Sequence, residues 1–212
     1  MAKAQAQVAA LRGGTSRSEH LRQKIIDVAL QHFSQFGFEG TSVRSVARAA
    51  DTTHPLVLYH FNTKDALWRE TMTATVGAYS RSIVELFKSN ENQPAEVSLQ
   101  RFIERFVRMS AERPEVHRIL TMASTQDTPR INWIVDEFLR DHFEMVVNCI
   151  RQGQQHGTVR DCDPSRLYYY IIGAAGTTFT LHGEIELLTG RQVFSETEIY
   201  HTIAFIFDIV FV

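Results

Sequence analysis

Side chains that can bind phosphate and read nucleobases are concentrated between positions 41 and 64 of this chain. They offer hydroxyl, guanidinium, imidazole, phenol and ammonium groups, with one proline among them: Thr41, Arg44, Thr52, Thr53, His54, Pro55, Tyr59, His60 and Lys64. Hydroxyls and cations are common partners of phosphate oxygens, and small polar groups can approach base edges closely. The composition therefore predicts a DNA-binding segment, provided that the backbone brings these groups to one surface.

The surrounding pattern predicts a backbone of that kind. From Ser18 the apolar residues recur at helical spacing, and Gly37 follows the last apolar turn, where a helix commonly stops. Thr41 is a plausible N-cap for a second helix, and residues 49–52 form a turn. Thr53 can cap a third helix that carries Pro55 in its first turn. A long helix, a short helix, a tight turn and a second short helix are what a protein needs to insert one helix into the major groove.

The third helix is expected at about residues 53–59. It would present its first turn to the bases and its flanks to the sugar–phosphate backbone of the DNA. Thr53, His54 and Pro55 would then approach base edges. Phosphates would be met by Thr41, Arg44, Tyr59, His60 and Lys64. Core packing is the competing interpretation for Tyr59, which stays open, and the preferred one for Phe61.

Two motifs follow each other here: Gly37-Phe-x-Gly40-Thr41-Ser-Val-x-x-Val46-Ala47-x-x-Ala50 and Leu58-Tyr59-x-Phe61-x-x-Lys64-Asp65-Ala66-Leu67. Together they resemble the N-terminal domain of TetR-family transcriptional regulators. The resemblance covers about residues 18–68. It implies DNA binding through the positions named above. Similar proteins usually have Gly-Val-Ser at the turn, where this chain has Asp51-Thr52-Thr53. Asp is one of the few other residues that tolerate a positive φ, and Thr52 can bring an extra hydroxyl to a phosphate.

Charge and periodicity predict how the rest of the chain is organised. Residues 1–64 carry eight Lys or Arg against four Asp or Glu, a net charge of +4, whereas residues 65–212 carry 14 against 20, a net charge of −6. A basic end on an acidic body suits attraction to phosphate at that end. We predict an all-α protein in which residues 1–17 are a flexible arm, residues 18–62 a helix-turn-helix domain, and residues 63–212 a larger helical domain that dimerises and that, as the family resemblance implies, binds a ligand.

A helix-turn-helix unit reads one half-site, so a homodimer on a near-palindromic operator is expected. The last two helices are the predicted dimer surface, because the final helix has more apolar surface than one neighbour can cover. The predicted interface residues are Leu167, Ile171, Ala174, Ile199, Ile203, Ile206, Phe207 and Val210. Ordinary core packing is the alternative.

The family resemblance also implies a cavity for a small-molecule effector among the middle helices. Its predicted lining combines aromatic, methionine and polar side chains: Phe106, Met109, Met122, Phe138, Tyr170, Thr177 and His182. Aromatic residues and methionines at helical spacing more often form a plain hydrophobic core than a pocket, so core packing is the competing interpretation for them. Ligand binding would shift operator affinity by favouring one separation of the two recognition helices.

Other classes of function lack their signatures. The chain has no P-loop, no dinucleotide-binding glycine pattern and no HExxH, and His182-Gly183-Glu184 lacks the downstream Cys-x-x-Cys of a zinc deaminase. We therefore expect no catalytic residues, no metal site and no cofactor. Cys149 and Cys162 lack metal-ligand spacing, and no apolar run has the roughly 20 residues of a membrane span, so a cytoplasmic protein is expected. The alternative function is a helical protein-interaction module with a degenerate helix-turn-helix that no longer binds DNA.

Overall fold

The computed structural model describes residues 2–125 and 129–212, with side chains from Ser18 onward. Every regular element within these ranges is a helix, and the β-pairing found there is an isolated bridge between Val159 and Phe211. The all-α prediction is confirmed. The chain divides into two compact units, at residues 1–74 and 75–212.

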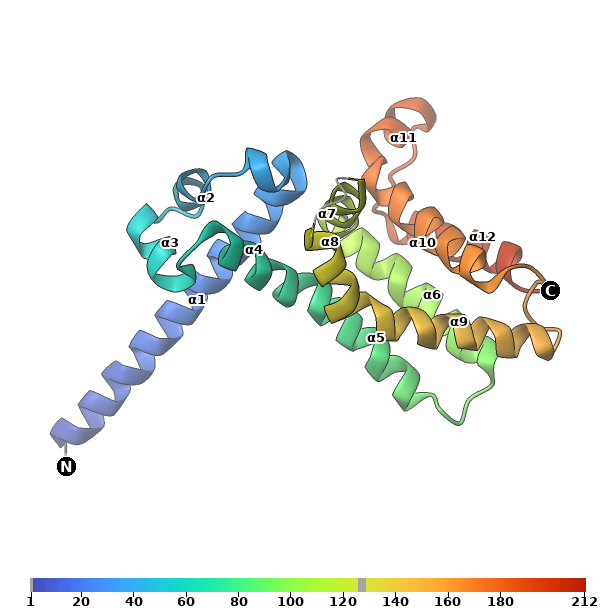
Figure 1. Cartoon of the computed structure of the whole chain (residues 1–212), viewed down its shortest axis with the longest axis horizontal. Coiled ribbons are helices and arrows are strands. Elements are labelled where there is room, and N and C mark those ends of the chain that lie inside the picture. The colour runs from blue at the N-terminus through green and yellow to red at the C-terminus, as the bar shows by residue number, and fades with distance from the viewer. Residues whose placement is uncertain (1, 126–128) are drawn as a thin grey trace. The chain divides into compact units, whose positions relative to one another are not determined.

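The first unit contains four helices within its described residues: α1 (Ala2–Gly40), α2 (Val43–Ala49), α3 (His54–Phe61) and α4 (Lys64–Met72). Figure 1 shows α2, α3 and α4 grouped beside α1, and α4 packs against α1. The core that holds them together is apolar and drawn from all four helices: Ile25, Ile26, Ala29, Leu30, Phe33, Val46, Ala47, Val57, Phe61, Leu67, Trp68 and Met72.

Several local expectations in this unit are met and others shift by a residue. The helix α1 is interrupted at Gly37, whose φ of 70° suits a glycine. The cap of α2 is Ser42 rather than Thr41, and Ser42 and Ser45 form a reciprocal capping box. The cap of α4 is Thr63, whose hydroxyl accepts from the Ala66 amide.

Two boundaries differ from the sequence-based prediction. The helix α1 begins at Ala2, so the stretch 2–17 that we expected as a flexible arm is helical. Its Ala- and Gln-rich composition explains this, since both residues have high helix propensity. The helix α4, which we placed in the second domain, belongs to the first unit, because Leu67, Trp68 and Met72 are buried where α4 packs on α1.

The chain passes from the first unit to the second within a π-helical turn, η1 (Thr73–Gly77). Beyond it follow α5 (Ala78–Ser89), α6 (Ala95–Glu112), α7 (Pro114–Thr125), α8 (Pro129–Ile134), a second π-helical turn η2 (Val135–Leu139), α9 (Arg140–Gln155), α10 (Pro164–Thr180), α11 (His182–Thr189) and α12 (Glu196–Val210).

The helix starts in the second unit follow their capping signals. The Asp163 carboxylate accepts from the Arg166 amide, and Pro164 occupies the first helical position, where proline is favoured. The Ser195 hydroxyl accepts from the Glu198 amide at the start of α12. Thr128 precedes Pro129 in the sequence in the same way and is a candidate cap, but it lies outside the described residues.

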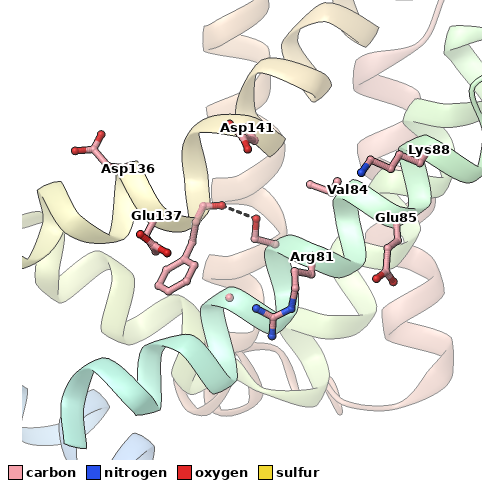
Figure 2. Close-up of a pocket in the computed structure, with 10 residues that line it drawn as sticks. Arg81, Val84, Glu85, Lys88, Asp136, Glu137 and Asp141 are labelled. Atoms are coloured by element: carbon pink, nitrogen blue, oxygen red, sulfur yellow. Dashed lines mark hydrogen bonds between the residues drawn. The ribbon is translucent and has the colours of Figure 1, made fainter. Parts of the chain in front are cut away.

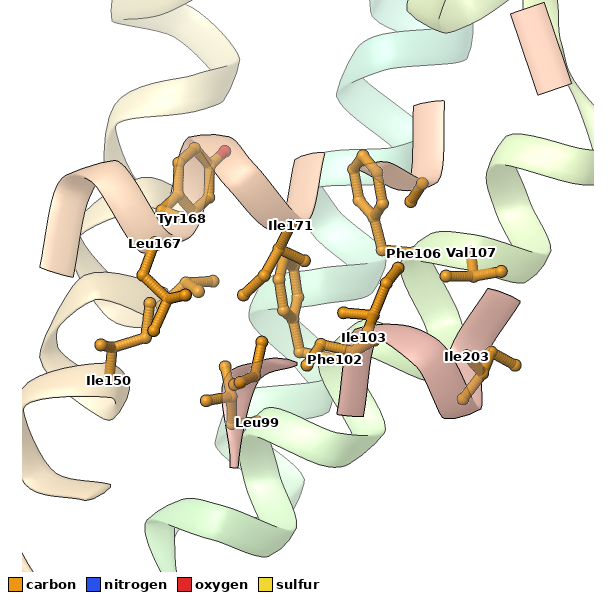
Figure 3. Close-up of a cluster of buried hydrophobic side chains, with 14 of the residues drawn as sticks. Leu99, Phe102, Ile103, Phe106, Val107, Ile150, Leu167, Tyr168, Ile171 and Ile203 are labelled. Atoms are coloured by element: carbon orange, nitrogen blue, oxygen red, sulfur yellow. The ribbon is translucent and has the colours of Figure 1, made fainter. Parts of the chain in front are cut away.

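The helix α6 lies at the centre of the second unit, where it packs against α5, α7, α9, α10 and α12. Figure 3 shows the side chains that fill this core, including Leu99, Phe102, Ile103, Phe106 and Val107 of α6. Residues from α9, α10 and α12 close around them, among them Ile150, Leu167, Tyr168, Ile171 and Ile203. Buried apolar area of this kind is the main source of folding stability.

Candidate functional site

The turn between α2 and α3 depends on Asp51. Its φ is 56°, so this residue takes the left-handed conformation for which similar proteins use glycine. The Asp51 amide donates to the Arg48 carbonyl and the Thr52 amide donates to the Ala47 carbonyl, which closes the turn. The prediction that Asp accepts a positive φ here is confirmed. The turn therefore keeps its shape without glycine.

The helix α3 has one buried side and one exposed side. Val57 and Phe61 are buried in the core of the first unit, in agreement with the core role preferred for Phe61. Tyr59 is 78% exposed, and Pro55 and Leu56 are also exposed. The open question about Tyr59 is settled against core packing, so its phenol is free to reach a phosphate.

The start of α3 is available for contact with bases. Thr53 is its N-cap residue but makes no side-chain cap hydrogen bond, and its side chain is exposed. His54 and Thr52 are partly exposed. Since the N-terminal residues of a recognition helix approach base edges, Thr53, His54 and Pro55 keep the role proposed for them.

The helix α2 packs against α3 and carries Arg44 and Arg48, both exposed. Thr41 needs a correction, since it is only 2% exposed and its hydroxyl donates to the Gly37 carbonyl at 2.8 Å. It stabilises the chain reversal after α1 and cannot offer its hydroxyl to a phosphate. The exposed Ser42 at the N-terminus of α2 takes its place as a candidate phosphate contact.

Lys64 and His60 lie at the opposite end of this region. The Lys64 ammonium lies 4.3 Å from the centre of the Phe38 ring and donates to the Glu39 carbonyl at 3.4 Å. These contacts hold the start of α4 against the end of α1 and leave part of the ammonium's hydrogen-bonding capacity for a phosphate. The partly exposed His60 contacts the rings of Tyr59 and Phe61.

Three exposed residues in this region escaped the sequence prediction: Ser42, Arg48 and Leu56. The Ser42-x-x-Ser45 spacing signals a capping box and could have identified Ser42. An arginine such as Arg48 is equally typical of a solvated helix surface, and an apolar Leu56 gives no signal for contact with DNA.

The helices α10 and α12 supply the predicted dimer surface, but the side chains we chose point inward. Six of the eight are buried within the second unit: Leu167, Ile171, Ile199, Ile203, Ile206 and Val210. Ala174 and Phe207 are partly buried against the same core. These residues stabilise the single chain, so core packing is the correct interpretation for them.

The outer sides of the same helices expose large aromatic residues. Tyr169 and Tyr170 on α10 are 66% and 50% exposed, and Tyr200 and Phe205 on α12 are 64% and 63% exposed. We call these four residues the outer aromatic surface. Exposed aromatic residues are enriched in protein–protein interfaces.

Comparison with known proteins agrees with this arrangement. A family model described as "Bacterial regulatory proteins, tetR family" matches residues 25–71, and one described as "YcdC-like protein, C-terminal region" matches residues 79–212. The second match alone covers more than half of the chain. The chain belongs to the TetR family of transcriptional regulators. Members of this family regulate transcription and are not enzymes, in agreement with the prediction.

Individual relatives are distant. The chain is 23% identical over 195 residues to the HTH-type transcriptional regulator RutR of Escherichia coli K12, covering 90% of this chain and 89% of RutR. It is 42% identical to AcrR of Shigella flexneri, over 53 residues and 25% of each chain. The crystal structure of HlyIIR, a hemolysin II transcriptional regulator, has the same fold at a TM-score of 0.67, with 18% identity and coverage of 88% of this chain and 97% of that one.

For a TetR-family regulator the second unit is where an effector is expected, but the predicted lining does not converge there. Tyr170 and Thr177 on α10 are exposed, because the buried side of that helix is formed by Leu167, Ile171 and Ala175. His182 begins α11 and packs on Phe194, with ring centres 5.1 Å apart. These three residues therefore do not line a common cavity.

The remaining predicted ligand residues are dispersed through the unit. Phe106 is buried in the core, and Met109 on the same helix is partly buried and accepts from the Ser82 hydroxyl at 3.7 Å. Met122 is partly buried on α7. Phe138 alone among the predicted residues lines a surface depression of about 350 Å³ between α5 and the η2–α9 segment, shown in Figure 2.

A buried polar cluster lies next to this depression, and no pattern in the sequence indicates it. His142 of α9 is buried, and its Nδ1 lies 3.1 Å from the Ser80 hydroxyl and 3.2 Å from the Phe138 carbonyl. Its Nε2 lies 3.2 Å from the Tyr168 hydroxyl. Burial lowers the pKa of His142, although the Phe138 carbonyl and the Asp141 charge act in the opposite direction.

In the described part of the chain, no group of three or more His, Cys, Asp or Glu side chains is placed to hold a metal ion. No helix among the described residues is long and apolar enough to cross a membrane.

Proposed function

We propose that this TetR-family regulator is a ligand-responsive repressor that binds a near-palindromic operator as a homodimer. One observation carries the proposal: the N-terminal turn and outer side of α3 are exposed while Val57 and Phe61 fasten its inner side to the unit. A rigidly held helix with one open side is the geometry of major-groove recognition. Such a regulator acts where the chromosome lies, in the cytoplasm.

Base recognition falls to the first turn of α3. The Thr53 hydroxyl and the His54 imidazole can exchange hydrogen bonds with base edges, and the Pro55 ring can contact a thymine methyl group. Each good base contact contributes about 1–3 kcal/mol of discrimination against a wrong base. His54 is therefore the residue whose replacement should alter sequence preference.

Phosphate contacts flank the recognition helix. Arg44, Thr52, Tyr59 and Lys64 supply a guanidinium, a hydroxyl, a phenol and an ammonium group, and the capped N-terminus of α2 adds backbone amides. These contacts position α3 and give the binding its salt dependence.

The outer aromatic surface of α10 and α12 is the proposed dimer contact. A symmetric pairing would place two recognition helices about 34 Å apart, one turn of the duplex. Phe205→Asp puts a charge into this contact and should yield monomers in size-exclusion chromatography with light scattering. Glu184→Asp, at an exposed position on α11, is the matched control. A Phe205→Asp protein that remains dimeric would remove this surface from the proposal.

The effector is proposed to weaken operator binding from within the second unit. A coupling free energy of about 1.4 kcal/mol is enough for a tenfold loss of operator affinity. Closely packed cores move between discrete arrangements, and a change between two such arrangements can supply a coupling free energy of this size.

The test begins with selection of bound fragments from a genomic library by the full-length protein. The expected result is an enriched near-palindromic motif, bound by the dimer with affinity that falls as salt rises. Absence of any enriched sequence would favour the alternative, a helical interaction module with a degenerate helix-turn-helix. Genes beside the enriched sites would then guide the choice of candidate effectors for operator titrations.

A further inference from the structure

Both π-helical turns, η1 and η2, contribute to the depression between α5 and the η2–α9 segment. Gly77 ends η1, and η2 supplies Asp136, Glu137 and Phe138 to the lining of this space of about 350 Å³. Single π-turns inside helices are frequent at functional sites. The coincidence of two such turns at one depression points to a binding site there.

Gly77 leaves room for two side chains in this depression. A Cβ added at Gly77 would lie 2.9 Å from Cε1 of the Phe138 ring and 3.2 Å from Nη1 of Arg81. A glycine inside a helical segment costs stability relative to alanine, and this close approach explains why the position lacks a side chain. The Arg81 guanidinium and the Phe138 ring therefore both lie against the bare backbone at Gly77.

Charges of opposite sign line the two walls of the depression. Arg81 and Lys88 come from α5, and a spacing of seven residues places them on one side of that helix. Glu137 and Asp141 come from the η2–α9 segment, and a spacing of four places them on one side as well. Figure 2 shows the two acids on one segment and the two bases on the other.

These four charges are not neutralised across the depression. The neighbouring Asp136 is held by Arg140, four residues along its own segment, at 2.5 Å. Among the residues that the structure describes, no ion pair joins the two bases to the two acids. The floor between the walls is buried, and there the Ser80 hydroxyl donates to the Phe138 carbonyl, the dashed line in Figure 2. An incoming molecule is therefore recognised by the charges on the walls.

We propose that this depression binds the effector and that the effector is a small zwitterion, an amino acid. Its ammonium group lies between Glu137 and Asp141, and its carboxylate is bound by Arg81. This inference rests on the proposed function and adds the place of binding and the class of ligand. An amino acid with separated charges fits best, because its methylene groups can lie over Val84 and the Phe138 ring while its ends reach opposite walls.

The two walls select against other classes of ligand. A molecule with one sign of charge is attracted by one wall and repelled by the other. An uncharged molecule forgoes charge-assisted hydrogen bonds, which are about twice as strong as neutral ones. A zwitterion meets both walls and adds no net charge to the depression. Because the wall charges are exposed, its affinity should fall as salt rises.

The place of the depression in the chain connects it to the DNA-binding unit. Gly77 is the last residue of η1, within which the chain passes from the first unit to the second. A zwitterion held by Arg81 and Glu137 ties α5, the helix that follows η1, to the η2–α9 segment. The bound molecule thereby favours one arrangement of the start of the second unit, and operator affinity changes with it.

Isothermal titration of the full-length protein tests the class of ligand. The probes are glycine, β-alanine, 4-aminobutyrate and 5-aminovalerate, which differ in the separation of their two charges, with butylamine and butyrate as probes of a single charge. At least one amino acid should bind about tenfold more tightly than butylamine or butyrate, because it makes charge-assisted hydrogen bonds to both walls.

Two variants identify which wall holds which group. Arg81→Gln should lower the affinity for the best amino acid about tenfold without weakening butylamine, and Glu137→Gln should lower it about tenfold without weakening butyrate. Arg191→Gln and Glu184→Gln, at exposed positions outside the lining, are the matched controls and should change none of these affinities. All four replaced side chains are exposed, so the variants should fold like the wild type.

Three results of the titrations would overturn the inference. They are binding of no probe at millimolar concentration, binding of butylamine or butyrate as tight as that of the best amino acid, and equal amino-acid affinity in Arg81→Gln and Arg191→Gln.

Operator titration on the same samples separates this inference from the proposed function. A saturating amount of the best amino acid should lower operator affinity in the wild type. Operator binding that is present but unchanged by the bound amino acid would overturn its role as effector. A protein that binds the amino acid and enriches no operator would refute the proposed function while the binding site stands.

Discussion

Substitution of Asp51 tests the recognition turn most sharply, because it separates backbone strain from charge. Asp51 holds a φ of 56°, and a residue with an ordinary Cβ pays roughly 1–2 kcal/mol in that region. Glycine avoids this strain but loses about 0.5–1 kcal/mol in extra chain entropy. Asp51→Gly should therefore be more stable than Asp51→Ala by about 0.5–1 kcal/mol, with wild type and Asp51→Asn between them.

Chemical unfolding in urea measures these differences, with Asp161→Ala as the control at an exposed Asp whose φ is not positive. Duplex binding by the same proteins gives an independent reading. Asp51→Asn and Asp51→Gly both remove a negative charge beside the proposed phosphate contacts, so both should bind DNA more tightly than wild type. The reasoning is refuted if Asp51→Ala is as stable as Asp51→Gly, or if removal of the charge leaves DNA affinity unchanged.

Three further outcomes are expected. Arg44→Ala should reduce the slope of log affinity against log salt by about one. The control Arg191→Ala, at an exposed position, should leave that slope unchanged. An equal effect of both variants would refute a local phosphate contact at Arg44. Burial lowers the pKa of His142, so the unfolded chain binds more protons than the folded one as pH falls below about 6.5, and the free energy of unfolding should decrease with acidification. His142→Asn should make the free energy of unfolding depend less on pH than it does in the control His201→Asn, at an exposed position. The same pH dependence in both variants would contradict this prediction. Burial raises the pKa of Cys149 to about 11, and its thiol donates to the Ala95 carbonyl. A thiol reagent at pH 8 should therefore modify Cys162 in the native protein and Cys149 only after unfolding. Rapid labelling of Cys149 in the native Cys162→Ser variant would be the contrary result.

Much of the fold follows from local signals in the sequence. Helical periodicity and capping residues indicate most helices; the cap residues Asp163 and Ser195, for example, stand where α10 and α12 begin. The turn at Asp51 was also predictable, because few residues tolerate a positive φ. These features depend on near neighbours in the chain, which is why a single sequence reveals them.

The side chains that form sites were harder to predict. The helices α10 and α12 are apolar on more than one side, so periodicity identified the helices but not which side packs inward; Ile171 is buried and Tyr170 beside it is exposed. Thr41 and Ser42 are adjacent hydroxyl residues, and only the backbone path decides which one caps α2. The polar cluster around His142 joins α5, α9 and α10, and contacts between such distant segments leave no pattern in one sequence.

The most direct measurement is the binding of wild type and His54→Ala to the selected operator and to a scrambled duplex of the same length, by fluorescence anisotropy at one fixed salt concentration. A recognition helix that begins at His54 predicts that the variant loses most of its preference for the operator while its affinity for the scrambled duplex stays the same. Unchanged preference in His54→Ala, or no preference in the wild type, would contradict the claim that α3 reads DNA sequence.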